Sequence, residues 1–345
     1  MTTVVIRADA SRTMGIGHIK RCLSVAAALQ QAGAVAVLAW RHVDVDCRPV
    51  IELAGCTSIC IADTALGDQY VDAQAFVAAA QPHRPDFVLV DHYGLDAVWH
   101  RTVRALLPAK RLGAIDDLGD RPLDVDLLVD HNHSADHQLK YSDRLQRPAR
   151  LLGGAAYAML APSFAHAPRR SVSDIVTSIG IFMGGTDDGG YSAMVHATLR
   201  RHLAFAGPIE IATTSGNRHL QALRAVCQQD QELTLTVDQQ DLAQFFARHD
   251  LHIGAGGGAT WERCCTGAPS VAVIVADNQR SVILPIAGLG VLSVVDIVPP
   301  TPEVLAPAIA SLMRDAQARR AMARAAQALV DGRGCQRIAR EILAP

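Results

Sequence analysis

The chain has 345 residues, a formal net charge of −2 and 50% hydrophobic residues, of which few are aromatic. This length predicts about two domains, and the small net charge with few aromatic side chains speaks against a nucleic-acid partner. No apolar stretch of about 18 residues and no signal-like leader occur, so we expect no membrane partner and a cytoplasmic location.

In the first half, short apolar segments rich in β-branched residues alternate with segments of helical spacing. The predicted strands are 4–8, 34–39, 58–62, 87–90, 111–115 and 127–129. The predicted helices are 18–31, 50–54, 72–80 and 97–107. This alternation is typical of a parallel sheet with helices on both faces.

The same alternation of strand and helix segments begins again in the second half, after a stretch that contains Pro162 and Pro168. Strands are predicted at 175–182, 209–213, 233–237, 251–253 and 271–275, and residues 303–345 are helical by composition. We therefore predict an α/β fold with two doubly wound, Rossmann-like domains that face each other across a cleft. The predicted domains are 1–160 and 174–320, with a linker at 161–173 and a helical segment at 321–345 that can pack back on the N-terminal domain.

The loop Gly15-Ile16-Gly17-His18 joins the first predicted strand to the first helix. Its glycines allow a tight turn and a close approach of the backbone to a ligand. His18 would lie in the first turn of the helix, where the helix dipole favours the neutral imidazole that a general base needs. Two alternatives stay open: a surface histidine at a helix start, and a dinucleotide fingerprint, which lacks its third glycine because Lys20 stands there.

A second glycine loop follows the strand at 251–253 and opens a helix. Gly256, Gly257 and Gly258 can turn backbone N–H groups inward, and with the helix N-terminus they predict a cradle for a diphosphate. Thr260 can add a hydroxyl donor, and Glu262 can accept hydrogen bonds from a ribose diol. The alternative is a glycine turn packed tightly against the sheet.

Two amide side chains, Asn278 and Gln279, follow the next predicted strand. They are candidates to bind sugar hydroxyls or phosphate, and the alternative is an ordinary polar loop.

Several motifs together resemble the UDP-sugar hydrolases of pseudaminic acid biosynthesis, over nearly the whole chain. In the first half they are Arg7-Ala-Asp-Ala-Ser11, Gly15-x-Gly-His18-x-x-Arg21, Asp91-His92-Tyr93-Gly94 and Asp116-Asp117. In the second half they are Gly184-Gly185-x-Asp187, Gly256-Gly-Gly258-x-Thr-Trp-Glu262, Asn278-Gln279 and Asp331-Gly332-x-Gly334. One departure is Ala259, where many members of the family have a hydroxyl residue.

The resemblance implies a GT-B fold related to the transferase that makes lipid II. It also implies His18 as the base, a C-terminal domain that binds UDP, and no metal or cofactor. The implied substrate is a UDP-linked 2,4-diacetamido-2,4,6-trideoxy sugar. Gly15, Gly17 and Arg21, which belong to the matched motif, are further predicted substrate contacts.

Hydrolysis of such a substrate needs a base for water, a cradle for the departing diphosphate and a closed site. Because UDP is a good leaving group, no pair of catalytic carboxylates is needed, and we expect attack by water with inversion. Tyr93 is predicted to orient the water or the sugar, although a half-buried aromatic without a role fits it equally. Asp9 and Asp91 end neighbouring strands and either bind sugar or hold their loops.

Three other functions fit parts of the sequence. A GT-B glycosyltransferase would share the fold, and a nucleotide-sugar-binding module would not need His18. A nicotinamide-dependent dehydrogenase comes last because its fingerprint is broken. The group of Asp130, His131, His133 and His137 has spacing that permits a metal, but we expect none, and we expect a monomer.

Overall fold

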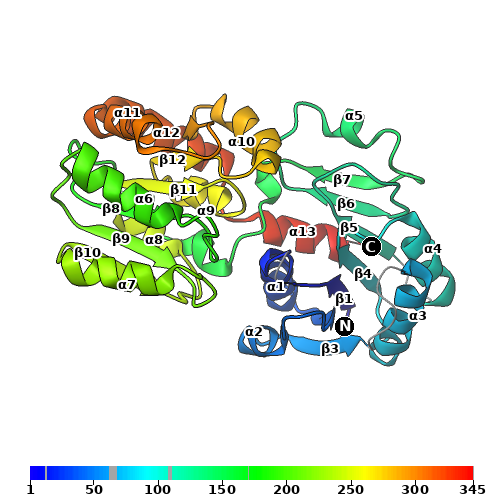
Figure 1. Ribbon diagram of the computed structural model, residues 1–345. Helices are drawn as coiled ribbons and strands as arrows, with labels where there is room; N and C mark the ends of the chain where they lie inside the picture. Colours follow the sequence, from blue (N-terminus) through cyan, green and yellow to red (C-terminus); the bar gives the residue numbers. More distant parts are fainter. Residues whose placement is uncertain (12–13, 62–67, 108–110, 170, 345) are drawn as a thin grey trace. The chain divides into compact units, whose positions relative to one another are not determined.

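The computed structural model describes residues 1–11, 14–61, 68–107, 111–169 and 171–344. The chain forms two compact units, one of Met1–Pro162 with Gly332–Pro345 and the other of Ser163–Asp331 (Figure 1). The chain therefore leaves the first unit, builds the whole of the second, and returns to the first for its last helix. Each unit is an α/β domain with one parallel sheet.

The sheet of the first unit has seven strands in the order β3-β2-β1-β4-β5-β6-β7. Their bounds are β1 (Thr3–Ala8), β2 (Val35–Arg41), β3 (Thr57–Ile61), β4 (Phe87–Asp91), β5 (Arg111–Ile115), β6 (Leu127–Asp130) and β7 (Arg150–Gly153). The strand order reverses between β1 and β4, which pair in parallel with Ala8 opposite Asp91. Loops that follow these two strands consequently meet at one point of the sheet edge.

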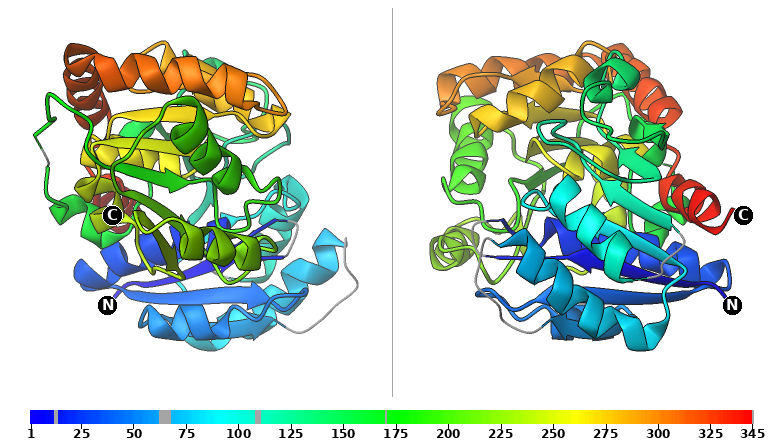
Figure 2. Two further views of the ribbon diagram at one scale, coloured as in Figure 1. Left: turned by 60° about the vertical axis from the view of Figure 1, so that its left-hand side comes forward. Right: turned by 90° about the vertical axis from the view of Figure 1, so that its right-hand side faces the viewer.

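Helices cover both faces of this sheet because alternate residues of the buried strands point to opposite sides. Val4 and Ile6 share a core with helices α1 and α13, whereas Val5 shares one with α3 and α4. The ribbon seen from two further sides shows helices on either side of the strands (Figure 2). The helices of the unit are α1 (Gly17–Gln31), α2 (Arg48–Leu53), α3 (Gln69–Ala80), α4 (Ala97–Leu106), α5 (His137–Tyr141) and α13 (Gly334–Leu343).

The sheet of the second unit has six strands in the order β10-β9-β8-β11-β12-β13, reversing between β8 and β11. Its strands are β8 (Ile179–Phe182), β9 (Ile209–Thr213), β10 (Leu233–Val237), β11 (Leu251–Ala255), β12 (Ser270–Val273) and β13 (Ser293–Val295). Its helices are α6 (Tyr191–Ala197), α7 (Leu220–Gln229), α8 (Ala243–Arg248), α9 (Ala259–Thr266), α10 (Arg280–Ala287), α11 (Pro302–Arg314) and α12 (Ala316–Leu329).

The predicted α/β class with two doubly wound sheets is confirmed. The strand predicted at 175–182 is shorter, because a carboxylate oxygen of Asp250 accepts the backbone N–H groups of Thr177 and Ser178. Strands β7 and β13 were not predicted. Ala62, the predicted end of the third strand, lies outside the described residues. None of the helices in the described ranges has the length and apolar character needed to cross a bilayer.

Candidate active site

The residues of the predicted base motif meet where the strand order of the first sheet reverses. His18 is the second residue of α1, which follows β1, and Asp91 is the last residue of β4. Nδ1 of His18 lies 2.7 Å from Oδ1 of Asp91, and only 5% of His18 is exposed. The pairing of β1 with β4 thus joins two residues that are 73 positions apart in the chain.

Asp91 is ionised and fixes the tautomer of His18. Burial opposes ionisation, but Arg21 and His18 hold the pKa of the Asp91 carboxyl below its ordinary value. Nη2 of Arg21 also lies 3.0 Å from Nδ1, but this nitrogen already donates to Oδ1 of Asp91 at 2.5 Å. The carboxylate is the nearer partner of Nδ1 and has no proton to donate, so we assign the hydrogen of the 2.7 Å contact to Nδ1 of His18. In the neutral imidazole the other ring nitrogen, Nε2, then carries the lone pair that a general base needs.

Arg21, one turn further along α1, binds the same carboxylate through two guanidinium nitrogens. Its Nε donates to Oδ2 of Asp91 at 2.6 Å and its Nη2 to Oδ1 at 2.5 Å. Residues three apart lie on one face of a helix, so His18 and Arg21 reach Asp91 together. Arg21 was predicted as a substrate contact, and in the structure its guanidinium contacts Asp91, Nδ1 of His18 at 3.0 Å and Asp117 at 3.4 Å.

Tyr93 lies edge-on to His18, with ring centroids 4.7 Å apart, and is 36% exposed. Its hydroxyl donates to Oδ1 of Asp117 at 2.8 Å. Burial and the Asp117 carboxylate raise the pKa of Tyr93, so the phenol keeps its proton near neutral pH. Tyr93 can therefore accept a hydrogen bond from a ligand but cannot take a proton from water.

Asp117 was not among the predicted site residues, although it appears in a matched motif. Its other oxygen, Oδ2, lies 3.4 Å from both Arg21 and the side-chain nitrogen of Asn132. The available signal was its position two residues after the end of β5, because the carboxyl ends of neighbouring parallel strands lie at one edge. Asp117 joins the ends of β5 and β6 to the His18 group.

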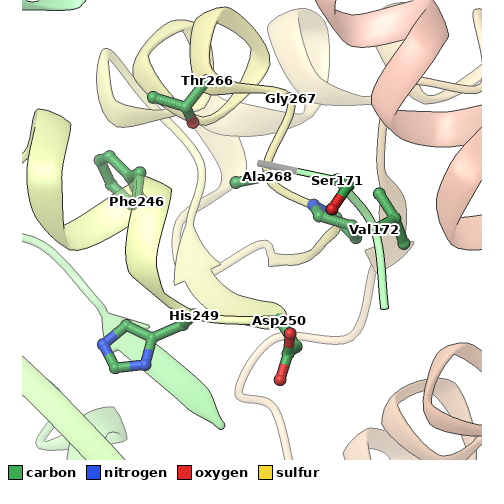
Figure 3. Close-up of a pocket in the computed structure, with 9 residues that line it drawn as sticks. Ser171, Val172, Phe246, His249, Asp250, Thr266, Gly267 and Ala268 are labelled. Atoms are coloured by element: carbon green, nitrogen blue, oxygen red, sulfur yellow. The ribbon is translucent and has the colours of Figure 1, made fainter. Parts of the chain in front are cut away.

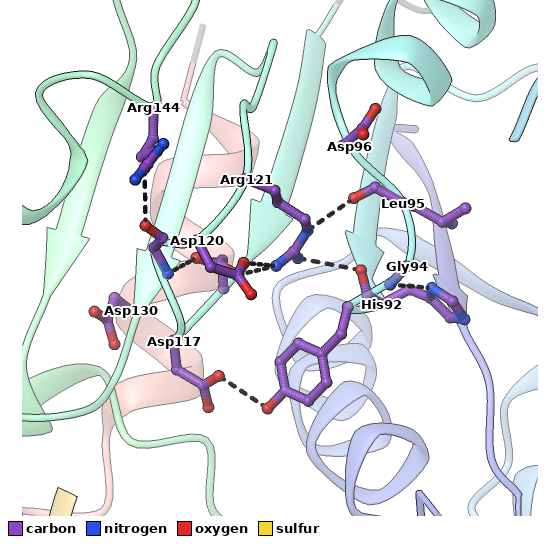
Figure 4. Close-up of polar contacts among 12 residues, drawn as sticks. His92, Gly94, Leu95, Asp96, Asp117, Asp120, Arg121, Asp130 and Arg144 are labelled. Atoms are coloured by element: carbon purple, nitrogen blue, oxygen red, sulfur yellow. Dashed lines mark hydrogen bonds and ion pairs between the residues drawn. The ribbon is translucent and has the colours of Figure 1, made fainter. Parts of the chain in front are cut away.

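Arg121 holds the loop that carries Tyr93. Its Nε donates to the carbonyl of Leu95 at 3.1 Å and its Nη2 to the carbonyl of His92 at 3.2 Å (Figure 4). The same guanidinium pairs with buried Asp116 at 2.7 Å and lies 5.9 Å from the ring centroid of Tyr93. These contacts of Arg121 connect the loop after β4 to the end of β5 and limit the movement of Tyr93.

Asp9, the other predicted carboxylate, holds its own loop. Arg7 donates to Oδ2 at 2.8 Å and the backbone N–H of Arg41 donates to Oδ1 at 2.7 Å. Burial opposes ionisation, but Arg7 lowers the pKa of Asp9, which is only 4% exposed. These contacts support the loop-holding alternative. Gly15 has a φ of +75°, which explains the need for glycine in the turn before α1.

In the second unit, the glycine loop lies between β11 and α9, beside the reversal of strand order. Gly257 has a φ of +127°, and a Cβ built on Gly257 or Gly258 would meet nothing within 4 Å. Gly258 occupies the N-cap of α9, which has no side-chain capping hydrogen bond. The backbone at this helix start is exposed and open to an approaching anion.

The polar residues predicted around this loop differ in their placement. Thr260 is 1% exposed, and its Oγ1 accepts a hydrogen bond from Arg263 at 3.1 Å. Gln279 donates to the carbonyl of Gly256 at 3.1 Å and accepts the N–H of Val275 at 3.0 Å, so its amide supports the loop. Asn278 is exposed, and Glu262 is half-buried.

A small pocket of the second unit lies at the opposite edge of the sheet (Figure 3). Among its lining residues, Asp250 directly precedes β11 and Ala268 shortly precedes β12, so the pocket lies at the amino ends of these strands. Ligands of open parallel sheets bind beyond the carboxyl ends. We therefore do not assign this pocket to the site.

The histidine-containing segment after β6 has internal partners. Nε2 of His137 donates to the carbonyl of Asn132 at 3.0 Å, and Lys140 pairs with Asp130 at 2.7 Å. Burial and the Arg21 cation lower the pKa of His131 to about 4. Among the residues that the structure describes, no three His, Cys, Asp or Glu side chains are grouped as metal ligands would be.

Comparison with known sequences gives one specific relative. No protein-family model matches the chain. The chain is 22% identical over 279 residues to the UDP-2,4-diacetamido-2,4,6-trideoxy-beta-L-altropyranose hydrolase of Campylobacter jejuni subsp. jejuni. The match covers 81% of this chain and 93% of that protein, and it confirms the resemblance indicated by the motifs.

Comparison with solved structures confirms the GT-B fold of two Rossmann-like domains. MurG of Acinetobacter baumannii has a TM-score of 0.64 at 17% identity, covering 99% of both chains. A glycosyltransferase from Rickettsia africae has a TM-score of 0.65 at 13% identity, covering 99% of this chain and 98% of its own. The UDP-GlcNAc 2-epimerase of Neisseria meningitidis, bound to UDP-GlcNAc, has a TM-score of 0.61 at 11% identity, covering 99% and 100%.

Proposed function

We propose that this protein hydrolyses a UDP-linked 2,4-diacetamido-2,4,6-trideoxyhexose of the L-altro type. The products would be UDP and the free sugar, with inversion at the anomeric carbon, in pseudaminic acid biosynthesis. Similarity to the Campylobacter hydrolase supports the substrate class. The fold shared with an epimerase bound to UDP-GlcNAc agrees with a UDP-sugar ligand.

The observation that carries the proposal is the His18–Asp91 pair, 2.7 Å apart at the reversal of the first sheet. With its proton held on Nδ1, His18 presents Nε2 to a water molecule. As the water oxygen bonds to the anomeric carbon, Nε2 takes a water proton. The bond from that carbon to the phosphate oxygen breaks, and its electron pair leaves with UDP. Asp91 stabilises the imidazolium that forms.

The leaving group would be stabilised at the glycine loop of the second unit. UDP departs with additional negative charge on its terminal phosphate, and exposed backbone N–H groups at a helix start stabilise such charge. Gly257 and Gly258 leave room for the phosphates to approach the start of α9. This chemistry requires no metal ion.

Tyr93 and Asp117 are proposed to orient the sugar. Because the Tyr93 hydroxyl donates to Asp117, its oxygen remains an acceptor for a sugar hydroxyl or acetamido N–H. The ring also covers one edge of His18 and limits the directions from which water reaches it.

The test is release of UDP from the purified UDP-sugar with EDTA present and no acceptor, for the wild type beside His18→Ala. We expect release by the wild type only, and NMR of the first product should show the inverted anomer. Retained configuration would contradict single displacement. Release that needs an added acceptor would indicate the alternative, a glycosyltransferase, whose fold the chain shares.

A further inference from the structure

Arg263, in the second unit, is a buried cation that no carboxylate neutralises by a hydrogen bond within the described part of the chain. It is 1% exposed, and its Nη2 donates to the carbonyl of Ala255 and to Oγ1 of Thr260, both at 3.1 Å. Its Nε and Nη1 are buried without a hydrogen-bond partner among the described residues. Burial lowers the pKa of Arg263 to about 10, so the side chain is still positively charged at neutral pH.

The guanidinium lies against the glycine loop. Ala255 ends β11 and Thr260 is in the first turn of α9, so Nη2 contacts the residues on both sides of the loop. A Cβ at Gly254 would lie 2.5 Å from Nη1 of Arg263 and 2.6 Å from the carbonyl oxygen of Phe182. Gly254 therefore makes room for the cation at the reversal between β8 and β11.

An isolated buried charge is costly, and proteins normally pair such groups. Here the charge adds to the positive end of the α9 dipole, at a helix start that no side chain caps. Both features favour an anion in the same place. A purely packing role would be served equally well by an uncharged side chain of the same length.

We propose that Arg263 is a positioning residue for the diphosphate of UDP and acts by its charge through the glycine loop. The inference rests on the proposed function, namely UDP binding by the second unit. Since the guanidinium is buried, it attracts the phosphates without direct contact, and it favours the diphosphate over the uncharged nucleoside.

The test compares binding of UDP and of uridine to the full chain by NMR titration. Arg263→Met should weaken UDP binding about 10-fold or more while changing uridine binding less than about 2-fold. Arg263→Lys, which keeps the charge, should retain most of the UDP affinity. Arg263→Met should stay close to the wild type in stability, because no hydrogen-bonded carboxylate of the described residues would be left buried and uncompensated by the change.

Arg319→Met is the matched control. Arg319 is also fully buried in the second unit, but its guanidinium donates to the carbonyls of Leu312, Met313 and Ser173. Its removal would leave these carbonyls without that donor and should lower stability. It should leave the ratio of UDP to uridine affinity unchanged.

Three results would overturn the inference. Equal weakening of UDP and uridine in Arg263→Met would indicate a structural role. An equally large loss of UDP affinity in Arg263→Lys would indicate that side-chain shape matters instead of charge. Absence of UDP binding by the wild type would remove the proposed function together with this inference. Should Arg263→Met not fold, Arg263→Gln takes its place in the same comparison.

Discussion

Nδ1 of His18 and Oδ1 of Asp91 are 2.7 Å apart, and the Asp91 side chain is completely shielded from solvent. The contact depends on the register of β1 and β4, which sets Ala8 beside Asp91 and brings the start of α1 over the end of β4. A carboxylate in this position determines which ring nitrogen of His18 carries the proton. The orientation of the His18 imidazole therefore depends on the pairing of β1 with β4 as well as on the loop before α1.

Asp91→Asn should lower kcat about 10²- to 10⁴-fold, the range expected when a base loses its orienting carboxylate. The amide of asparagine can donate to Nδ1, which moves the histidine proton to Nε2 and removes the acceptor for water. The affinity for UDP should stay near that of the wild type. Steady-state UDP release and UDP titration measure the two effects separately.

Asp130→Asn is the control for that variant. Asp130 is also fully buried, at the end of β6, but it pairs with Lys140 and makes no contact with His18. Its replacement should lower the unfolding midpoint without a comparable loss of kcat. An equal loss of kcat in both variants would show that buried charge near the site matters, and not the tautomer of His18.

Tyr93→Phe should lower kcat/KM about 10-fold, since it removes one hydrogen-bonding group toward the sugar. The free energy of unfolding should change by less than about 1 kcal/mol because Tyr93 is partly exposed. If Tyr93 and Asp117 act as one unit, the double variant Tyr93→Phe, Asp117→Asn should lose less transition-state stabilisation, calculated from kcat/KM, than the two single variants lose together. Additive losses would contradict that coupling.

Gly258→Ala should weaken UDP binding about 10-fold and leave the protein folded. The φ of Gly258 is −54°, which any residue adopts, and the added methyl would meet nothing within 4 Å in the unliganded chain. The methyl would instead occupy space needed by the phosphates. Gly17→Ala, equally open at the start of α1, is the control and should leave UDP affinity unchanged. Unaltered UDP binding by Gly258→Ala would place the nucleotide elsewhere.

Stability should fall on acidification below about pH 6.5, partly through His100. Burial and the Arg121 cation lower the pKa of His100 to about 3 in the folded state, and its Nδ1 accepts the N–H of Asp124. Between these two values the unfolded chain binds more protons than the folded one, so the free energy of unfolding decreases as pH falls.

At pH 5, the contribution of His100 should be a loss of about 2 kcal/mol relative to neutral pH. Denaturant unfolding of His100→Gln at both pH values should show a correspondingly smaller difference. His42→Gln, which changes an exposed histidine, should keep the wild-type pH dependence. If His100→Gln keeps it as well, another buried group must carry the effect.

The strands and helices that flank the two sheet reversals could be predicted because apolar periodicity and glycine signals agree there. Strands β7 and β13 could not, since three or four residues hold too little periodicity to distinguish a strand from a loop. The two-sheet architecture followed from alternation alone. The strand order, with seven strands in one sheet and six in the other, required pairings that composition does not reveal.

At the site, the sequence indicated which residues gather but not what each contacts. Asp91 was predicted to bind sugar or hold a loop, and only the β1–β4 register shows that it orients His18. Asp117 was missed because a carboxylate after a strand is common, and its link to Tyr93 is a tertiary contact. Thr260 points into the interior toward Arg263, which spacing along α9 does not predict.

The return of α13 to the first unit also governs the order in which the protein can fold during synthesis. Ile338 and Ile342 belong to the same buried core as Leu29 of α1, yet the whole second unit is translated between them. On the ribosome, the second unit has its complete core before the first unit has. Until α13 emerges, one apolar face of α1 is not covered, so the first unit completes its core after the second unit does.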